Sequence, residues 1–134
     1  MPIPPVVSLR RSNLEDLCLA REDLVGVDLT GANLRLANLR GARLREAGLS
    51  GANLGGSHLG GADLFGADLR GADLRGADLR NADLCKADLR NADLRGANMS
   101  SSLHSGAKLS GALYDDLTVM PYFVDPVKKM MVKS

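Results

Sequence analysis

The sequence repeats every five residues over most of its length, and this period restricts the possible folds more than any other feature. Leucine occupies eighteen consecutive positions spaced five apart, from Leu9 to Leu94. In the most regular stretch, Gly61 to Met99, an alanine lies two residues before each leucine and before Met99. An internal period is considered before other signals because it decides the architecture.

A period of five fits neither an α-helix nor a straight strand. In a helix each repeat would advance the leucine by about 140°, so no apolar stripe would form. In a strand, an odd spacing would place successive leucines on opposite faces. A chain that bends once per repeat can direct every leucine toward one axis, with glycine at the corners. The period therefore predicts a solenoid of hydrogen-bonded coils, and it leaves open whether three, four or five pentads close a coil.

The A-[DN]-L-x-[GN] pattern, from about Val7 to Val124, resembles the pentapeptide-repeat family. The resemblance implies an all-β fold, a right-handed quadrilateral β-helix with four pentads per coil and about six coils. It also implies that the leucine and the small residue two places before it point inward. Aromatic residues make up only 3% of the chain, which agrees with a narrow core of leucine and alanine.

We expect three segments along the chain. Residues 1–6, rich in proline, are predicted to be an N-terminal lead-in or cap. Residues 7–124 are predicted to form the β-helix. Residues 125–134 are predicted to form a capping helix that begins with Asp125 as N-cap and Pro126 at the first helical position. The helix would place Val127, Met130 and Met131 on one face.

The repeat degrades at two places. Glu22 stands at an inward position, where an unpaired carboxylate would be costly, so we expect local distortion or an arginine partner such as Arg10, Arg11 or Arg21. After Ser100–Ser102, the inward residue is either His104 or a slipped Leu103. We favour a bulge that turns Leu103 inward.

No residues form a recognisable catalytic or metal-binding pattern. The aspartates recur in every regular pentad, which is typical of turn residues that bond to local backbone. The histidines and cysteines have no zinc-ligand spacing. Cys18 and Cys85 would lie three coils, about 14 Å, apart, too far for a disulfide. We therefore predict free thiols, no enzyme activity, no cofactor and no metal.

The charges are balanced, with 17 basic and 16 acidic residues. A nucleic-acid-binding domain is usually strongly basic, so we expect no nucleic-acid partner. The sequence has no long apolar segment, so we expect no membrane contact and a cytoplasmic location. The pairs Gly55-Gly56 and Gly60-Gly61 predict a smooth patch across one corner.

A candidate interaction surface is indicated where apolar residues occupy outward positions. On twenty-residue coils, Val25, Phe65 and Cys85 fall in one column, with Leu103 and Phe123 on the same side. The C-terminal segment adds Tyr122, and it is predicted either to cap the core alone or also to form a dimer. The chain would then be a monomer or a dimer.

The sequence favours a non-enzymatic structural or protein-interaction module with a protein partner that it does not identify. The family resemblance supplies an alternative, a DNA mimic that binds or protects the type II topoisomerase gyrase. Such mimicry requires a strongly negative surface. Residues 61–98 carry seven aspartates against five arginines and one lysine, a net charge of −1, which disfavours the alternative.

Overall fold

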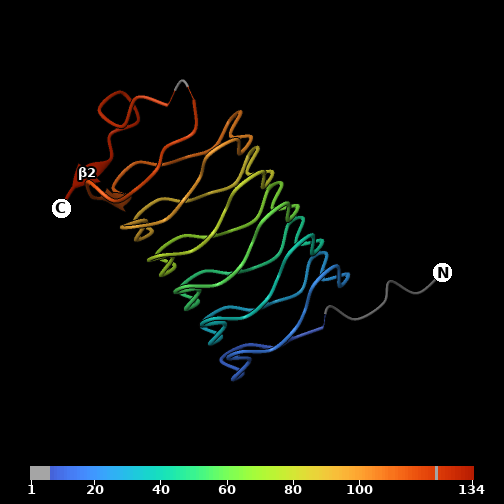
Figure 1. Cartoon of the computed structure of the whole chain (residues 1–134). Helices are drawn as coiled ribbons and strands as arrows, with labels where there is room; N and C mark the ends of the chain where they lie inside the picture. Colours follow the sequence, from blue (N-terminus) through green and yellow to red (C-terminus); the bar gives the residue numbers. More distant parts are fainter. Residues whose placement is uncertain (1–6, 123) are drawn as a thin grey trace.

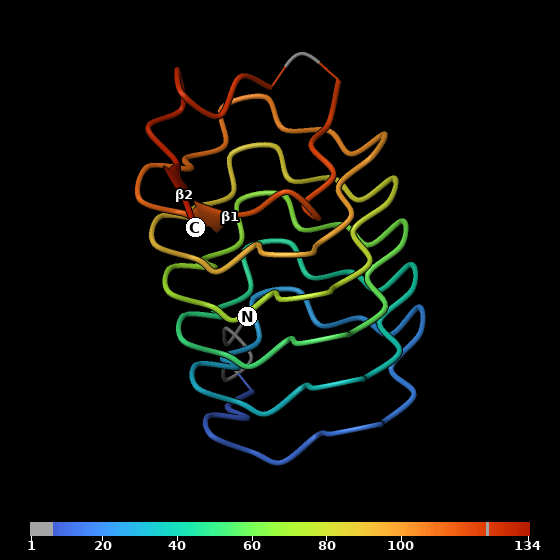
Figure 2. The same ribbon diagram turned by 60° about the vertical axis from the view of Figure 1, so that its left-hand side comes forward.

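The protein is a stack of similar coils, seen side-on in Figure 1 and turned by 60° in Figure 2. The computed structural model describes residues 7–122 and 124–134. Parallel bridges join residues twenty apart in successive coils; Asn53, for example, is bridged to Asp73, and Asp73 to Asp93. Four pentads therefore close one coil, which resolves the choice that the period alone left open.

The pentad from Asp73 to Ala77 shows how the backbone N–H and carbonyl groups find hydrogen-bond partners. The Leu74 N–H donates to the carbonyl of Asp93 (2.8 Å), and the Gly76 N–H donates to that of Arg95 (3.0 Å). The Asp73 N–H donates in the other direction, to the preceding coil. The Ala77 N–H closes a turn onto the Leu74 carbonyl (3.0 Å). Each coil is thus bonded to both neighbours, as buried backbone groups require.

The core is a column of leucine and alanine side chains. The central leucines from Leu29 to Leu94 are fully buried, and Met99 takes the same place one pentad later. Most of the alanines two residues before them are also fully buried. Burying one leucine side chain contributes about 1.5–3 kcal/mol relative to leaving it exposed, so repetition of the pentad supplies the stability of the stack.

The corners explain the glycines of the repeat. The residue two places after each leucine adopts a left-handed conformation, for example Gly76 with φ of 66°. Among the corners that the structure describes, twelve hold glycine and nine hold other residues, including Leu36 with φ of 60°. This conformation costs roughly 1–2 kcal/mol for residues with a Cβ atom, which is why glycine is the commonest residue there.

The expected distortion at Glu22 is wrong. The Glu22 N–H donates to the Leu19 carbonyl (3.2 Å), and the Glu22 carbonyl accepts from the Arg43 N–H (2.9 Å), as in other pentads. The Glu22 side chain is exposed. Val7 and Leu17, at equivalent positions of this first described coil, are exposed as well. The predicted lead-in, residues 1–6, lies outside the described residues.

The prediction that Leu103 turns inward is also wrong. Leu103 is 58% exposed and is bridged to Asp83, while Ser102 is buried and His104 occupies the half-buried central position. The Leu103 N–H donates to the Ala82 carbonyl (2.9 Å). The Leu103 carbonyl accepts from the Leu84 N–H (2.7 Å). The ladder therefore keeps its phase, because a bulge would give up both of these bonds to the preceding coil.

The C-terminal capping helix is not present, because residues 126–130 form turns. Asp125 does act as a local cap, since its Oδ1 accepts from the Val127 N–H (3.0 Å). The turn ends at Met130, whose φ is 57° and whose side chain is exposed. The chain then returns to the stack, where β2 (Val132–Lys133) pairs in parallel with β1 (Leu113–Tyr114).

This return closes the end of the core in place of a helix. Met131 and Val124 are partly buried and pack against the core cluster. Val127 is exposed, so the expected single apolar face of Val127, Met130 and Met131 does not form. Across residues 7–122 and 124–134 the structure contains no helix, and hence none able to cross a membrane.

We predict that Leu74→Ala lowers the free energy of unfolding by about 2–5 kcal/mol, because it leaves a cavity in a fully packed core. Leu117→Ala is the matched control, since Leu117 is 75% exposed; it should change stability by less than about 0.5 kcal/mol. Urea titration followed by circular dichroism measures both. Equal effects of the two substitutions would contradict the proposed core.

Candidate interaction surfaces

The stack has four sides, which we number by their central leucines: the first contains Leu69, the second Leu74, the third Leu79 and the fourth Leu84. The first three sides carry repeated pairs of aspartate and arginine on either side of the central leucine. The pairs are Asp68–Arg70, Asp73–Arg75, Asp78–Arg80, Asp88–Arg90 and Asp93–Arg95. The same unit thus recurs on the first and second sides and is present once on the third, at Asp78–Arg80.

Each unit combines a turn and an ion pair. The Asp73 Oδ1 accepts from the Arg75 backbone N–H (3.0 Å) and from its Nε (2.9 Å), and the Arg75 Nη2 donates to Asp73 Oδ2 (2.6 Å). Exposed ion pairs contribute only about 0–1 kcal/mol each. Their main consequence is that the arginine and aspartate charges neutralise each other within each of these five pentads.

The hydrogen bonds from arginine lower the pKa of these carboxyl groups. The effect is largest at Asp78, where the Arg80 side chain holds the pKa at about 2. Bonds from the Arg80 backbone and the charge of Arg40 act in the same direction, and burial opposes them. The aspartates of these units are therefore poor proton donors or acceptors near neutral pH, which fits a structural rather than a catalytic role.

The fourth side departs from this unit. The Asp63 Oδ1 still accepts from the Phe65 N–H (3.1 Å), and the Asp83 Oδ1 accepts from the Cys85 N–H (2.9 Å). The arginine of the unit is absent from both pentads. The ring of Phe65 is half-buried, with the Arg45 guanidinium 4.2 Å from its centroid and the Lys86 Nζ at 5.5 Å. Two cations thus stack against one aromatic ring.

The structure brings part of the predicted surface together. Phe65, Cys85 and Leu103 belong to three consecutive coils of the fourth side, since Asp63, Asp83 and Leu103 are joined in one series of bridges. Val25 is exposed two coils before Phe65, with Arg45 between them. That these residues contact a partner stays a prediction.

The other two members of the predicted surface lie beyond this group. Tyr122 is 81% exposed in the C-terminal segment, and Phe123 lies outside the described residues. Cys18 and Cys85 are free thiols. The Asp83 carboxylate raises the pKa of the Cys85 thiol, which keeps that thiol protonated and weakly nucleophilic.

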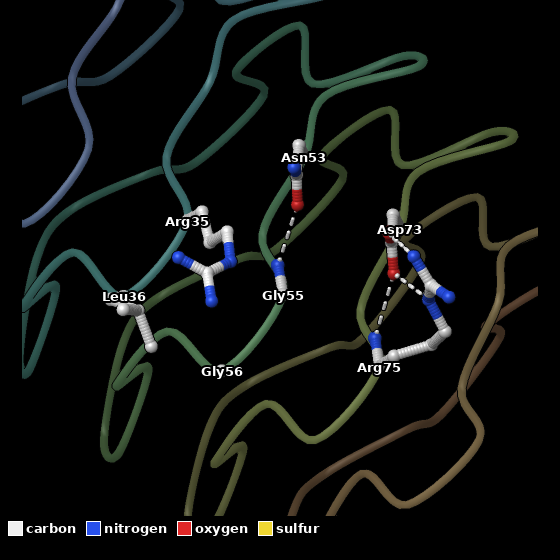
Figure 3. Close-up of a pocket in the computed structure, with 7 residues that line it drawn as sticks. All are labelled: Arg35, Leu36, Asn53, Gly55, Gly56, Asp73 and Arg75. Carbon is white, nitrogen blue, oxygen red and sulfur yellow. Dashed lines mark hydrogen bonds and ion pairs between the residues drawn. The ribbon is translucent and has the colours of Figure 1, made fainter.

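The glycine pairs form hollows rather than the expected smooth patch. On the second side, Gly55 and Gly56 lie between Arg35 and Arg75 and open a hollow of about 280 Å³ that Leu36 also lines (Figure 3). The sequence does contain a signal for this hollow, because glycine replaces arginine at position 55 in the column of residues 35, 55 and 75. The missing side chain leaves a gap between two long ones.

A second hollow of about 340 Å³ lies on the third side, at Gly60 and Gly61 between Arg40 and Arg80. Within the part of the chain that the structure describes, no three histidine, cysteine or acidic residues are grouped so that they could hold a metal ion.

Comparison with known proteins identifies the family. The family model described as pentapeptide repeats matches residues 23–61 and 62–100, in eight copies. The chain belongs to the pentapeptide-repeat family. Rfr23, a pentapeptide-repeat protein of the cyanobacterium Cyanothece 51142, is 37% identical over 80% of this chain and 86% of its own, with a TM-score of 0.79.

A pentapeptide-repeat protein from the thylakoid lumen of Arabidopsis thaliana is 35% identical over 80% of this chain and 71% of its own, with a TM-score of 0.55. The fluoroquinolone resistance protein QnrB1 is 20% identical over 77% of this chain and 61% of its own, with a TM-score of 0.50, which shows a shared fold alone. No curated protein matches the sequence. The pentapeptide-repeat relatives imply a right-handed quadrilateral β-helix, as predicted; the capping helix is not present, and the number of about six coils stays a prediction.

We predict that Asp78→Asn reduces the melting temperature near neutral pH and that the reduction disappears in acid. The pKa of Asp78 is lowered in the folded state, from 3.8 to about 2. Its stabilising effect is therefore complete above the unfolded pKa and is lost as the pH falls through the folded pKa. Asparagine occupies the equivalent positions 38 and 98, so the turn should persist.

Melting curves of both proteins between about pH 7 and about pH 1.5 provide the measurement, because this range spans both pKa values. Arg80→Gln serves as a control. Its melting temperature should also fall below that of the wild type near neutral pH but not in acid, because it removes the partner of the carboxylate. A difference between wild type and Asp78→Asn that stays constant down to the lowest pH would contradict the assignment.

Proposed function

We propose that the protein is a non-enzymatic protein-binding module, a rigid rod that contacts its partner through the fourth side. The observation that carries this proposal is the interruption of the aspartate–arginine unit on that side. Phe65 stands where the unit has arginine, and Leu103 stands where it has aspartate. Family members are generally structural or interaction modules rather than enzymes, which agrees with this proposal.

The paired charges make the other three sides less suitable for tight binding. A partner that covered the Asp73–Arg75 pair would have to remove both charges from water, and the Coulomb attraction of a buried pair often fails to offset that cost. The fourth side also holds an ion pair, Arg45–Asp63 (3.3 Å), but it adds an aromatic ring and an exposed leucine. Aromatic residues and arginine are enriched among the residues that dominate binding energy.

The hydrogen-bonded stack also favours binding by a preformed surface. The coils are held at a regular spacing of about 4.8 Å, so the outer side chains have fixed relative positions along the rod. A surface that is already ordered loses little conformational entropy on association.

The charge of the chain argues against the alternative of a gyrase-directed DNA mimic. The regular part of the rod, residues 61–98, has a net charge of −1, and its arginines lie against the carboxylates. A DNA supercoiling assay with purified gyrase tests the alternative. Inhibition of gyrase, or its protection from a quinolone, would favour mimicry over the module proposed here.

We predict that the double variant Phe65→Arg, Leu103→Asp captures at least about tenfold less partner than the wild type in quantitative affinity capture from the native host. Such a loss is expected when a dominant contact is removed. Both substitutions restore residues that the regular pentad already contains, so the fold should be preserved. Arg90→Ala, on the first side, is the matched control and should retain the partner.

Melting curves confirm that each variant is folded before capture. A protein recovered equally by the wild type, the double variant and the control would contradict binding through the fourth side. Recovery of no protein above an unrelated β-helical bait would contradict the module itself.

A further inference from the structure

We propose that the hollow at Gly55 and Gly56 on the second side binds the aromatic side chain of a protein partner. This site is separate from the proposed contact on the fourth side, and it does not depend on that contact. A comparison between two sides of the same rod supports it.

The fourth side shows how an aromatic ring fits this backbone. Phe65 follows the central leucine of its pentad, and the Arg45 guanidinium, from the preceding coil, lies 4.2 Å from the ring centroid. Gly55 holds the equivalent position two pentads earlier, and Arg35 is the equivalent of Arg45. In Figure 3 the guanidinium of Arg35 lies beside Gly55, a residue that has no side chain to place against it. The second side thus has the arginine of this arrangement without the ring.

The backbone does not require glycine at this position. Gly55 lacks the positive φ of the corner glycines, and arginine occupies its place in the adjacent coils. A Cβ atom on Gly55 would lie 3.2 Å from Asn53 Oδ1 and 3.8 Å from the Arg75 carbonyl oxygen. A side chain can therefore be accommodated there, and its absence creates the space.

Leu36 supplies an apolar wall. It keeps a left-handed conformation with φ of 60° and is 40% exposed. A Cβ atom on Gly56 would lie only 2.8 Å from Leu36 Cδ2, so the glycine at position 56 leaves room for the leucine. The corner of the coil imposes this conformation on residue 36, as it does at the equivalent corners Arg21 and Glu46.

The charges around the hollow favour a ring over an anion. Arg35 Nη1 is 2.8 Å from Glu15 Oε1, and Arg75 Nη2 is 2.6 Å from Asp73 Oδ2. Two basic and two acidic groups leave no net charge to attract a phosphate or carboxylate. The flat face of a guanidinium that already has a carboxylate partner can still stack on an aromatic ring.

The volume of the hollow is also large enough for an aromatic ring. A closed cavity of about 150 Å³ is sufficient for benzene, and this hollow measures about 280 Å³. The third-side hollow provides a contrast, because Gly41 stands there in the position that corresponds to Leu36. That hollow has the two arginines, Arg40 and Arg80, but no leucine wall.

The test is a nuclear magnetic resonance titration of the full chain with N-acetyl-tyrosinamide as the probe. We expect saturable, ring-current shifts at the Leu36 methyl groups and at the amides of Gly55 and Gly56. N-acetyl-leucinamide should bind at least about tenfold more weakly, because it cannot stack on the guanidinium. Gly55→Arg restores the regular column and should reduce the affinity for the tyrosine probe at least about tenfold, whereas Gly60→Arg, in the other hollow, should leave it unchanged.

Three results would overturn the proposal. The first is the absence of saturable shifts at Leu36 and the two glycines. The second is an unchanged response in Gly55→Arg. The third is a stronger response to inorganic phosphate or acetate than to the tyrosine probe, which would make the hollow an anion site. Phe65→Arg should still bind the probe, so failure of the fourth-side proposal and failure of this one can be told apart.

Discussion

The structure depends on hydrogen bonds between residues separated by one full coil. In the regular coils each central leucine donates its N–H to a carbonyl nineteen residues later, as Leu74 does to Asp93, and the same spacing places its side chain against the leucines of adjacent coils. The ladder and the core therefore enforce one another. A shift in phase would lose both at once, which explains why the chain holds its register at Leu103 and leaves that side chain exposed.

The regular ladder also determines where the surface can acquire specific binding properties. Wherever the pentad is complete, aspartate and arginine neutralise each other locally and leave a surface with little affinity of its own. Specific properties arise where a residue of the unit is exchanged. Phe65 adds an aromatic ring on one side, and Gly55 removes a side chain on the opposite side. Both exchanges leave the backbone unchanged, so the surface can vary while the core stays constant.

The five-residue period is enough to predict the solenoid, because burial of inward leucines such as Leu74 provides most of the stability of the fold. The four-sided shape of the coil is predicted only from the family resemblance. The structure at the ends of the stack is harder to predict from the sequence. Asp125 accepts a backbone N–H bond in a turn, but the helix that it was predicted to begin does not form, since Met130 turns the chain back toward β1. The sequence predicts a smooth patch at Gly55 instead of a hollow, because the depth comes from side chains in adjacent coils rather than from its own pentad.

Amide hydrogen exchange, followed residue by residue, tests the central claim of a backbone ladder between successive coils. Such a ladder predicts a protection profile with a period of five along the middle coils. The leucine N–H groups, bonded to the next coil, should exchange slowest. The N–H of the residue that follows each leucine, such as Arg75, should exchange fastest, since a side-chain carboxylate is its partner. Protection without this period, or confined to one continuous segment, would contradict the account.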